Sequence, residues 1–172
     1  VVDTPGWIYN TPSCDTSIMD KLEMKLSVSL CPPVPHTIIL TVPFASAFNK
    51  PCCQAVREHM MLFGEDVWRY TIVLFIRGDW LGDTTAEERI ESEGEDLKWL
   101  VEKCGNRYHV FNNNNRDDDT QVKELMEKID ELVASNSGSC YEIHRDVAME
   151  NAEKNKLIEE NAGKLVYLLH KL

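Results

Sequence analysis

The chain has 172 residues, of which 43% are hydrophobic and 27% charged, a composition typical of a globular protein with one domain. Its formal net charge of −11 disfavours nucleic acid and acidic membrane surfaces as partners, because both are polyanions. No apolar run approaches the ~18–20 residues of a transmembrane helix, so we expect no membrane-spanning segment.

The six cysteines are scattered, without a Cys-x-x-Cys pair or a regular spacing to the five histidines. This pattern argues against a zinc site. Scattered cysteines in a chain without a secretory signal indicate reduced thiols, so we expect a cytoplasmic protein.

A loosely helical pattern covers residues 12–31. Its apolar face would consist of Ile18, Leu22, Leu26 and Val28. Residues 36–42 form a β-branched apolar run, which is typical of a parallel strand buried on both faces. A helix is expected over residues 50–62, with Gly64 as its terminator.

Residues 71–76 (TIVLFI) predict a second buried strand. One helix is expected from a cap at Thr84 or Thr85 to Gly105, followed by a third strand at residues 108–111. An amphipathic helix should begin at Thr120. Strands that alternate with helices predict a doubly wound parallel sheet, hence an α/β fold.

The last part of the chain differs in composition from the rest. Residues 141–172 are rich in charged residues and contain no strand pattern. We therefore predict a domain at residues 1–136 and an acidic helical tail at residues 137–172. The tail could pack on the domain or on a second copy of the chain.

Polar residues follow three of the predicted strands, and the first group is Asp3-x-x-Gly6 after Val1-Val2. A carboxylate at such a strand end can hold a Mg²⁺-bound water, which makes Asp3 a candidate metal residue. Gly6 would let a backbone N–H approach a terminal phosphate. Thr-Pro-Gly is also a common tight turn.

The other two groups are Arg77-Gly78-Asp79 and Phe111-Asn112-Asn113. The carboxyl ends of parallel strands face one crevice, where ligands bind. A carboxylate there can accept the two N–H donors on the edge of guanine, and a long basic side chain can lie over the base. These roles would fall to Asp79 and Arg77.

Four longer strings resemble the immunity-associated GTPases, the IMAP or avirulence-induced-gene family. They are Val2–Trp7, Phe63–Trp68, Leu74–Asp79 and Cys104–Asn113, of which the last contains the Cys-Gly-Asn-Arg-Tyr box of that family. The resemblance covers residues 1–136. It implies a P-loop GTPase-like fold, GTP or GDP with Mg²⁺, slow GTP hydrolysis, and oligomerisation with itself or with related family members.

The resemblance also assigns residues to the site. It implies nucleotide binding by Asp3, Gly6, Arg77, Asp79, Asn112 and Asn113, and Mg²⁺ held by Asp3 through water. It carries over no catalytic residue. Trp7 stands where many GTPases have a Gln that orients the attacking water, so hydrolysis should be slow or depend on a partner.

The chain departs from the family pattern in its phosphate loop. G-x-x-x-x-G-K-[ST] is missing, since the only Gly-Lys pair is Gly163-Lys164, with Ile158 and Leu165 in place of the first Gly and the hydroxyl residue. We therefore interpret the chain as the C-terminal part of a GTPase domain that lacks its first two strands. Taken alone, it should bind no nucleotide and be inactive.

The guanine box has two possible alignments. One makes Asp79 the base-reading residue and the other makes it Trp80. We favour Asp79, because an indole has one donor and no acceptor.

Two functions remain open. The complete form would be an oligomerising guanine-nucleotide switch, whereas this chain could be a nucleotide-free interaction module or an inactive remnant. A small-molecule enzyme is disfavoured, because no nucleophile–base pair is visible at the strand ends. In a Ras-like domain the first strand lies between the third and fourth. We therefore expect residues 37–42 to be an exposed edge of a three-stranded sheet, Val1–Trp7 to be poorly anchored, and the chain to associate through that edge.

Overall fold

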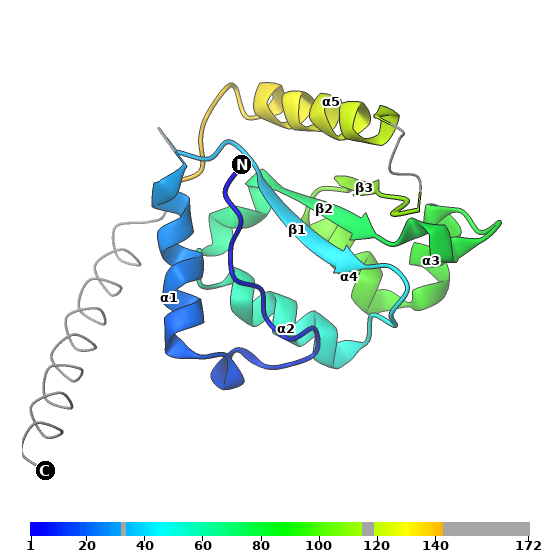
Figure 1. Ribbon diagram of the computed structural model, residues 1–172, viewed down its shortest axis with the longest axis horizontal. Helices are drawn as coiled ribbons and strands as arrows, with labels where there is room; N and C mark the ends of the chain where they lie inside the picture. The colour runs from blue at the N-terminus through cyan, green and yellow to red at the C-terminus, as the bar shows by residue number, and fades with distance from the viewer. Residues whose placement is uncertain (32–33, 115–118, 143–172) are drawn as a thin grey trace, which may run out of the picture. The chain divides into compact units, whose positions relative to one another are not determined.

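Three parallel strands lie at the centre of the computed structural model, which describes residues 1–31, 34–114 and 119–142 (Figure 1). The strands are β1 (Ile38–Pro43), β2 (Thr71–Ile76) and β3 (Tyr108–Val110), in the order β1-β2-β3. Ile38 lies opposite Thr71 in β2, and Val73 of β2 lies opposite Tyr108. The predicted α/β fold with a parallel three-stranded sheet is therefore confirmed.

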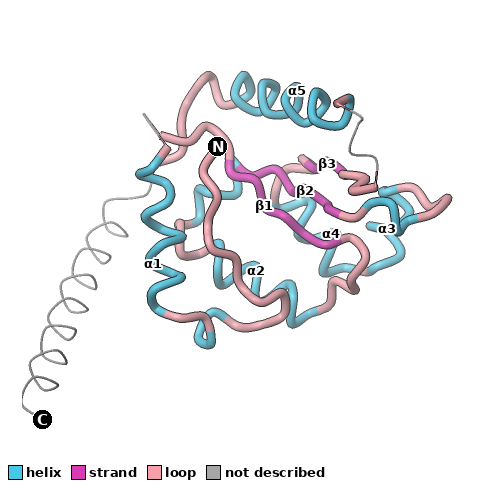
Figure 2. The backbone as a smooth tube through the Cα atoms, viewed as in Figure 1, coloured by secondary structure: helices cyan, strands magenta, loops and turns pink. Residues whose placement is uncertain are grey.

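β2 is the central strand, and its residues Thr71–Phe75 are all buried. Figure 2 shows why: helix α5 (Thr120–Ser135) is drawn on one side of the sheet and helix α2 (Lys50–Met60) on the other. β1 alternates instead, with Leu40 and Val42 buried. Helices on both sides explain the unbroken apolar run of β2.

The helices begin at capping residues that the sequence displays. Asn49 accepts a hydrogen bond from the Cys52 N–H at the start of α2. Thr85 and Glu88 form a reciprocal capping box at helix α3 (Ala86–Glu93), which confirms the predicted cap. In the described part of the chain, no helix has the length and apolar character that crossing a bilayer requires.

The single helix predicted from Thr84 or Thr85 to Gly105 is wrong. Two helices occupy this stretch, α3 and α4 (Glu95–Lys103), and Gly94 separates them. Gly94 has φ 107° and ψ −170°, which no helix contains and which glycine adopts at little cost.

The predicted apolar face of the first helix is only partly correct: Val28 is buried and Leu22 is half-buried, but the other two predicted residues are exposed. This region forms α1 (Ile18–Ser27), with the short 3-10 turns η1 (Ser13–Asp15) and η2 (Val28–Leu30) on either side. Met24 is 1% exposed, whereas Ile18 is 64% exposed and Leu26 also faces solvent. The buried face of α1 runs instead through Met24 and Lys25 towards Val28, so it is rotated away from the row of Ile18 and Leu26.

β1 lies at the edge of the sheet, as predicted. It pairs with β2 on one side, and among the described residues no strand pairs with its other side. Residues 1–7 form no strand. β1 contains no charged residue and Ile39 is 36% exposed, so association through this edge stays a prediction.

The packed unit continues beyond α5. Tyr141 is buried, its N–H donates to the Pro35 carbonyl at 2.8 Å, and its hydroxyl donates to the Phe63 carbonyl. The compact unit ends at Glu142. Residues 143–172, which make up most of the predicted tail, lie outside the described residues, so the domain boundary at residue 136 stays a prediction.

The Cys-Gly-Asn-Arg turn joins α4 to β3 and has a structural role. Gly105 and Asn106 both have left-handed backbone angles, with φ +64° and +57°. A Cβ at Gly105 would overlap the Arg107 guanidinium, which folds back over the turn. Arg107 Nε donates to the Thr71 carbonyl at 3.1 Å and Nη2 to the Trp68 carbonyl at 2.8 Å. These two bonds hold the start of β3 beside the start of β2.

Replacement of Arg107 by Ala should therefore destabilise the fold. Two carbonyls would lose a charged donor, and such bonds contribute about 1.5–3 kcal/mol each. We expect the free energy of unfolding in urea to fall by about 2 kcal/mol or more. Lys98→Ala is the matched control, because Lys98 contacts Glu95 at 3.5 Å on the helix surface, and it should cost below about 1 kcal/mol. Equal losses for the two variants would contradict this role of Arg107.

Candidate functional site

The turn after β2 is built to approach the end of β3. Arg77 has a left-handed conformation (φ 62°, ψ 40°) and precedes the 3-10 turn η4 (Gly78–Leu81). The Gly78 N–H donates to the Phe111 carbonyl at 2.8 Å. A Cβ at Gly78 would overlap the Val110 side chain and lie 3.1 Å from the Phe111 oxygen, so a larger residue would push the two turns apart.

Side chains from both turns complete this connection. The Arg77 N–H donates to Asn113 Oδ1 at 2.6 Å, and the Asn113 N–H donates to Asp79 Oδ1 at 3.0 Å. The Asn114 side-chain amide donates to Asp79 Oδ2, also at 3.0 Å. The two turns therefore hold each other through Asn113, which accepts from the Arg77 N–H and donates to Asp79.

Asn112 adds a link from the same turn to α5. Its N–H donates to Gln121 Oε1 at 2.8 Å, and its side-chain oxygen accepts from the Asn114 N–H at 3.0 Å. The structure thus brings Arg77, Asp79, Asn112 and Asn113 together at the carboxyl ends of β2 and β3. This is the edge of a parallel sheet at which ligands bind.

Both candidates for reading the base lie at this surface. The Trp80 side chain is exposed (70%), and its backbone N–H donates to the Arg77 carbonyl at 3.2 Å. The Asp79 carboxylate already accepts one donor on each oxygen, yet its two oxygens offer about four acceptor positions. Asp79 can therefore still accept donors from a base, which an indole cannot do.

Asp3 and Gly6 are not part of this cluster. Both are exposed; Asp3 Oδ1 accepts from the Thr4 N–H at 3.1 Å, and an added Cβ on Gly6 would meet no atom within 4 Å. In Figure 1 the N-terminus is drawn away from the carboxyl ends of β2 and β3. The structure does not bring the expected phosphate residues to the expected base residues.

Asp3 does not form a Mg²⁺ site by itself. Mg²⁺ requires a near-octahedral set of oxygen ligands. In residues 1–31, 34–114 and 119–142, no three His, Cys, Asp or Glu side chains are grouped so that they could hold a metal ion. A single exposed carboxylate forms no Mg²⁺ site without a nucleotide to supply further oxygens.

The segment after Gly6 is held on α2 by a contact that the sequence does not reveal. The Trp7 ring stacks on the His59 ring at 4.4 Å between centroids, with the planes 5° apart. His59 Nε2 lies 2.7 Å from Thr16 Oγ1, and Nδ1 lies 2.7 Å from the Ala55 carbonyl. Because a carbonyl only accepts, Nδ1 carries the proton and Nε2 accepts from Thr16. Trp7 is thus anchored, contrary to the expectation for Val1–Trp7.

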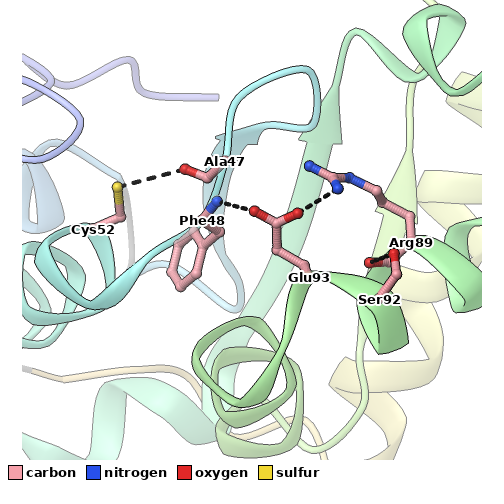
Figure 3. Close-up of polar contacts among 6 residues, drawn as sticks. All are labelled: Ala47, Phe48, Cys52, Arg89, Ser92 and Glu93. Carbon is pink, nitrogen blue, oxygen red and sulfur yellow. Dashed lines mark hydrogen bonds and ion pairs between the residues drawn. The ribbon is translucent and has the colours of Figure 1, made fainter.

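A second contact holds the same segment two residues later. Tyr9 packs edge-on against Phe48, with ring centroids 6.3 Å apart. Figure 3 shows the Phe48 N–H and Arg89 on either side of Glu93, which accepts from the first and pairs with the second. Burial raises the pKa of Tyr9 above its usual range. The N-terminal segment therefore rests on the loop before α2, which α3 holds in place.

Comparison with known proteins identifies relatives along most of the chain. The model of the AIG1 family matches residues 1–161. Human GTPase IMAP family member 8 is 31% identical over 141 residues, which cover 80% of this chain and 20% of the human protein. Immune-associated nucleotide-binding protein 8 of Arabidopsis thaliana is 28% identical over 172 residues, covering 95% and 48% of the two chains. This chain thus spans between a fifth and about half the length of these relatives.

The His59 contacts predict that mild acid weakens the fold. Burial lowers the pKa of His59 in the native state from the ordinary value of 6.5. The unfolded chain therefore takes up a proton more readily, so stability is complete above about pH 7 and falls as the pH decreases through 6.5 towards the lowered native pKa. Urea unfolding at pH 7.5 and 5.5 should show this loss.

His59→Gln removes the titrating group and should reduce the difference between the two pH values. Part of the difference should remain, because burial also lowers the pKa of His109. An unchanged difference in the Gln variant would show that His59 does not titrate in this way.

Proposed function

Because this chain belongs to the AIG1 family, we propose that it provides the base-binding part of a guanine-nucleotide site. The observation that supports the proposal is the connection between the turns after β2 and β3. It places a carboxylate, a guanidinium-bearing residue and two asparagines at one edge of the sheet. The names of the relatives support the same reading, since they are called GTPase or nucleotide-binding.

Within this site we assign base recognition to Asp79. Its carboxylate would accept the two N–H donors of guanine, and charge-assisted bonds of this kind are short and strong. Arg77 would lie over the base, where its planar guanidinium can stack. Asn113 would hold the Asp79 carboxylate in position, because its backbone N–H donates to Oδ1 at 3.0 Å.

The phosphate-binding role that we propose for Asp3 and Gly6 applies only in a protein that also contains a phosphate loop. There the carboxylate of Asp3 would hold a Mg²⁺-bound water, and the Gly6 N–H would donate to the terminal phosphate. Mg²⁺ would neutralise phosphate charge in such a complex. Trp7, stacked on His59, has no acceptor that could orient an attacking water as a Gln does, so we propose slow or partner-dependent hydrolysis.

We propose that the nucleotide-bound protein oligomerises with a second copy or with related family members. The uncharged edge strand β1 supports such contacts. We also propose a cytoplasmic location, which is supported by six cysteines that are all unpaired.

A second candidate function is a nucleotide-free interaction module or an inactive remnant. It is favoured by the 172 residues themselves, which contain no G-x-x-x-x-G-K-[ST]. Titration with nucleotide separates the two candidates.

The isolated 172-residue chain should not bind GTP–Mg²⁺ at micromolar concentrations. Phosphate contacts supply much of the affinity in this fold, and the loss of ~4–6 kcal/mol weakens binding roughly a thousandfold or more. Isothermal titration should therefore detect no binding in the micromolar range. A dissociation constant of a few micromolar for the chain alone would overturn this expectation.

The base-reading role can be tested in a fusion that adds a phosphate loop to these residues. There Asp79→Ala should weaken GTP binding by about 2 kcal/mol or more, because the two guanine donors would lose a charged acceptor. Trp80→Ala should have a clearly smaller effect. Equal effects, or a larger effect at Trp80, would mean that the base-reading position is residue 80.

A further inference from the structure

The Asp79 carboxylate is occupied in the structure by a side chain of its own turn. The Asn114 amide nitrogen lies 3.0 Å from Asp79 Oδ2. An amide NH₂ is the same kind of donor as the guanine edge presents. Resting on the base-reading role proposed for Asp79, we propose that Asn114 occupies the acceptor position on Oδ2 that a guanine N–H would use, so that it is an internal competitor that guanine displaces.

Asn114 can leave this position more easily than Asn113 can. Asn113 uses its side-chain oxygen on the Arg77 N–H and its backbone N–H on Asp79, so its departure would separate the two turns. Asn114 donates to Asp79 through its side chain, while its backbone N–H is bound to Asn112 Oδ1. The residue is exposed, so rotation of its side chain disturbs neither the turn nor the core.

The exchange favours one class of base. Guanine offers two neighbouring N–H donors, and a single carboxylate can accept both. Adenine offers one donor beside an acceptor nitrogen, and that nitrogen would face the carboxylate unfavourably. Guanine therefore replaces the Asn114 bond with two bonds, whereas adenine replaces it with one bond and a repulsion. Asn114 thus lowers the affinity for guanine, whereas an adenine base, which gains little at Asp79, should hardly be affected by it.

The size of the effect follows from how often Asn114 occupies Asp79. The apparent dissociation constant equals the intrinsic constant divided by the fraction of molecules with an open site. If Asn114 is bound about nine-tenths of the time, its removal should tighten guanine binding about tenfold; occupancy of about one half gives about twofold. We expect a change within this range.

The test compares the unmodified 172-residue chain with Asn114→Ala in titrations with GMP and AMP at millimolar concentrations. The two nucleotides share ribose and phosphate, so their difference reports the base. Asn10→Ala is the matched control, because Asn10 is an exposed asparagine outside the site. We expect Asn114→Ala to bind GMP about two- to tenfold more tightly than the unmodified chain, and the Asn10 variant to match the unmodified chain.

The outcomes separate this inference from the proposed function. GMP binding with equal affinity by the unmodified chain and Asn114→Ala overturns the inference and leaves the proposed function intact. Equal tightening for AMP and GMP also overturns it, because competition for Asp79 should act on guanine. Absence of GMP binding by every variant at these concentrations overturns the inference and is the result that the nucleotide-free alternative predicts. A side-chain amide resonance of Asn114 that shifts with GMP but not with AMP supports displacement independently.

Discussion

Hydrogen bonds between the turns after β2 and β3 are the constraint on which the candidate site depends. Gly78 and Arg77 donate backbone N–H groups to the second turn, and Asn113 returns a backbone N–H to Asp79. The connection requires glycine at position 78, because any side chain would meet Val110. The Asp79 carboxylate is thereby fixed before a ligand arrives, and such preorganisation reduces the cost of binding.

The expected phosphate side of the site has a different environment. Trp7 and Tyr9 are packed against α2 and the loop before it, whereas Asp3 and Gly6 are exposed and have few contacts. If Gly6 binds a phosphate, the next residue, Trp7, is already held in place by its stacking on His59. The residues proposed to bind the base are thus held by bonds between two turns of the sheet, whereas those proposed to bind the phosphate have few contacts of their own.

The sequence predicted local features well, because neighbouring residues cause them. The apolar run at 71–76 is β2, and Thr85 caps α3 with Glu88, as expected. The break at Gly94 was missed, because apolar spacing continues across it and only the backbone angle reveals it. The contacts of Asp79 with Asn113 and of Trp7 with His59 join residues 34 and 52 positions apart, and no local pattern encodes such pairs.

The central claim is that both turns form one base site, and chemical-shift mapping with GMP tests it most directly. In a ¹⁵N-labelled chain, millimolar GMP should shift the backbone amides of Arg77–Trp80 and of Asn112–Asn114 together, with one shared dissociation constant. AMP should leave them nearly unchanged. Shifts confined to one turn, shifts located elsewhere in the fold, or equal shifts with both nucleotides would contradict the account.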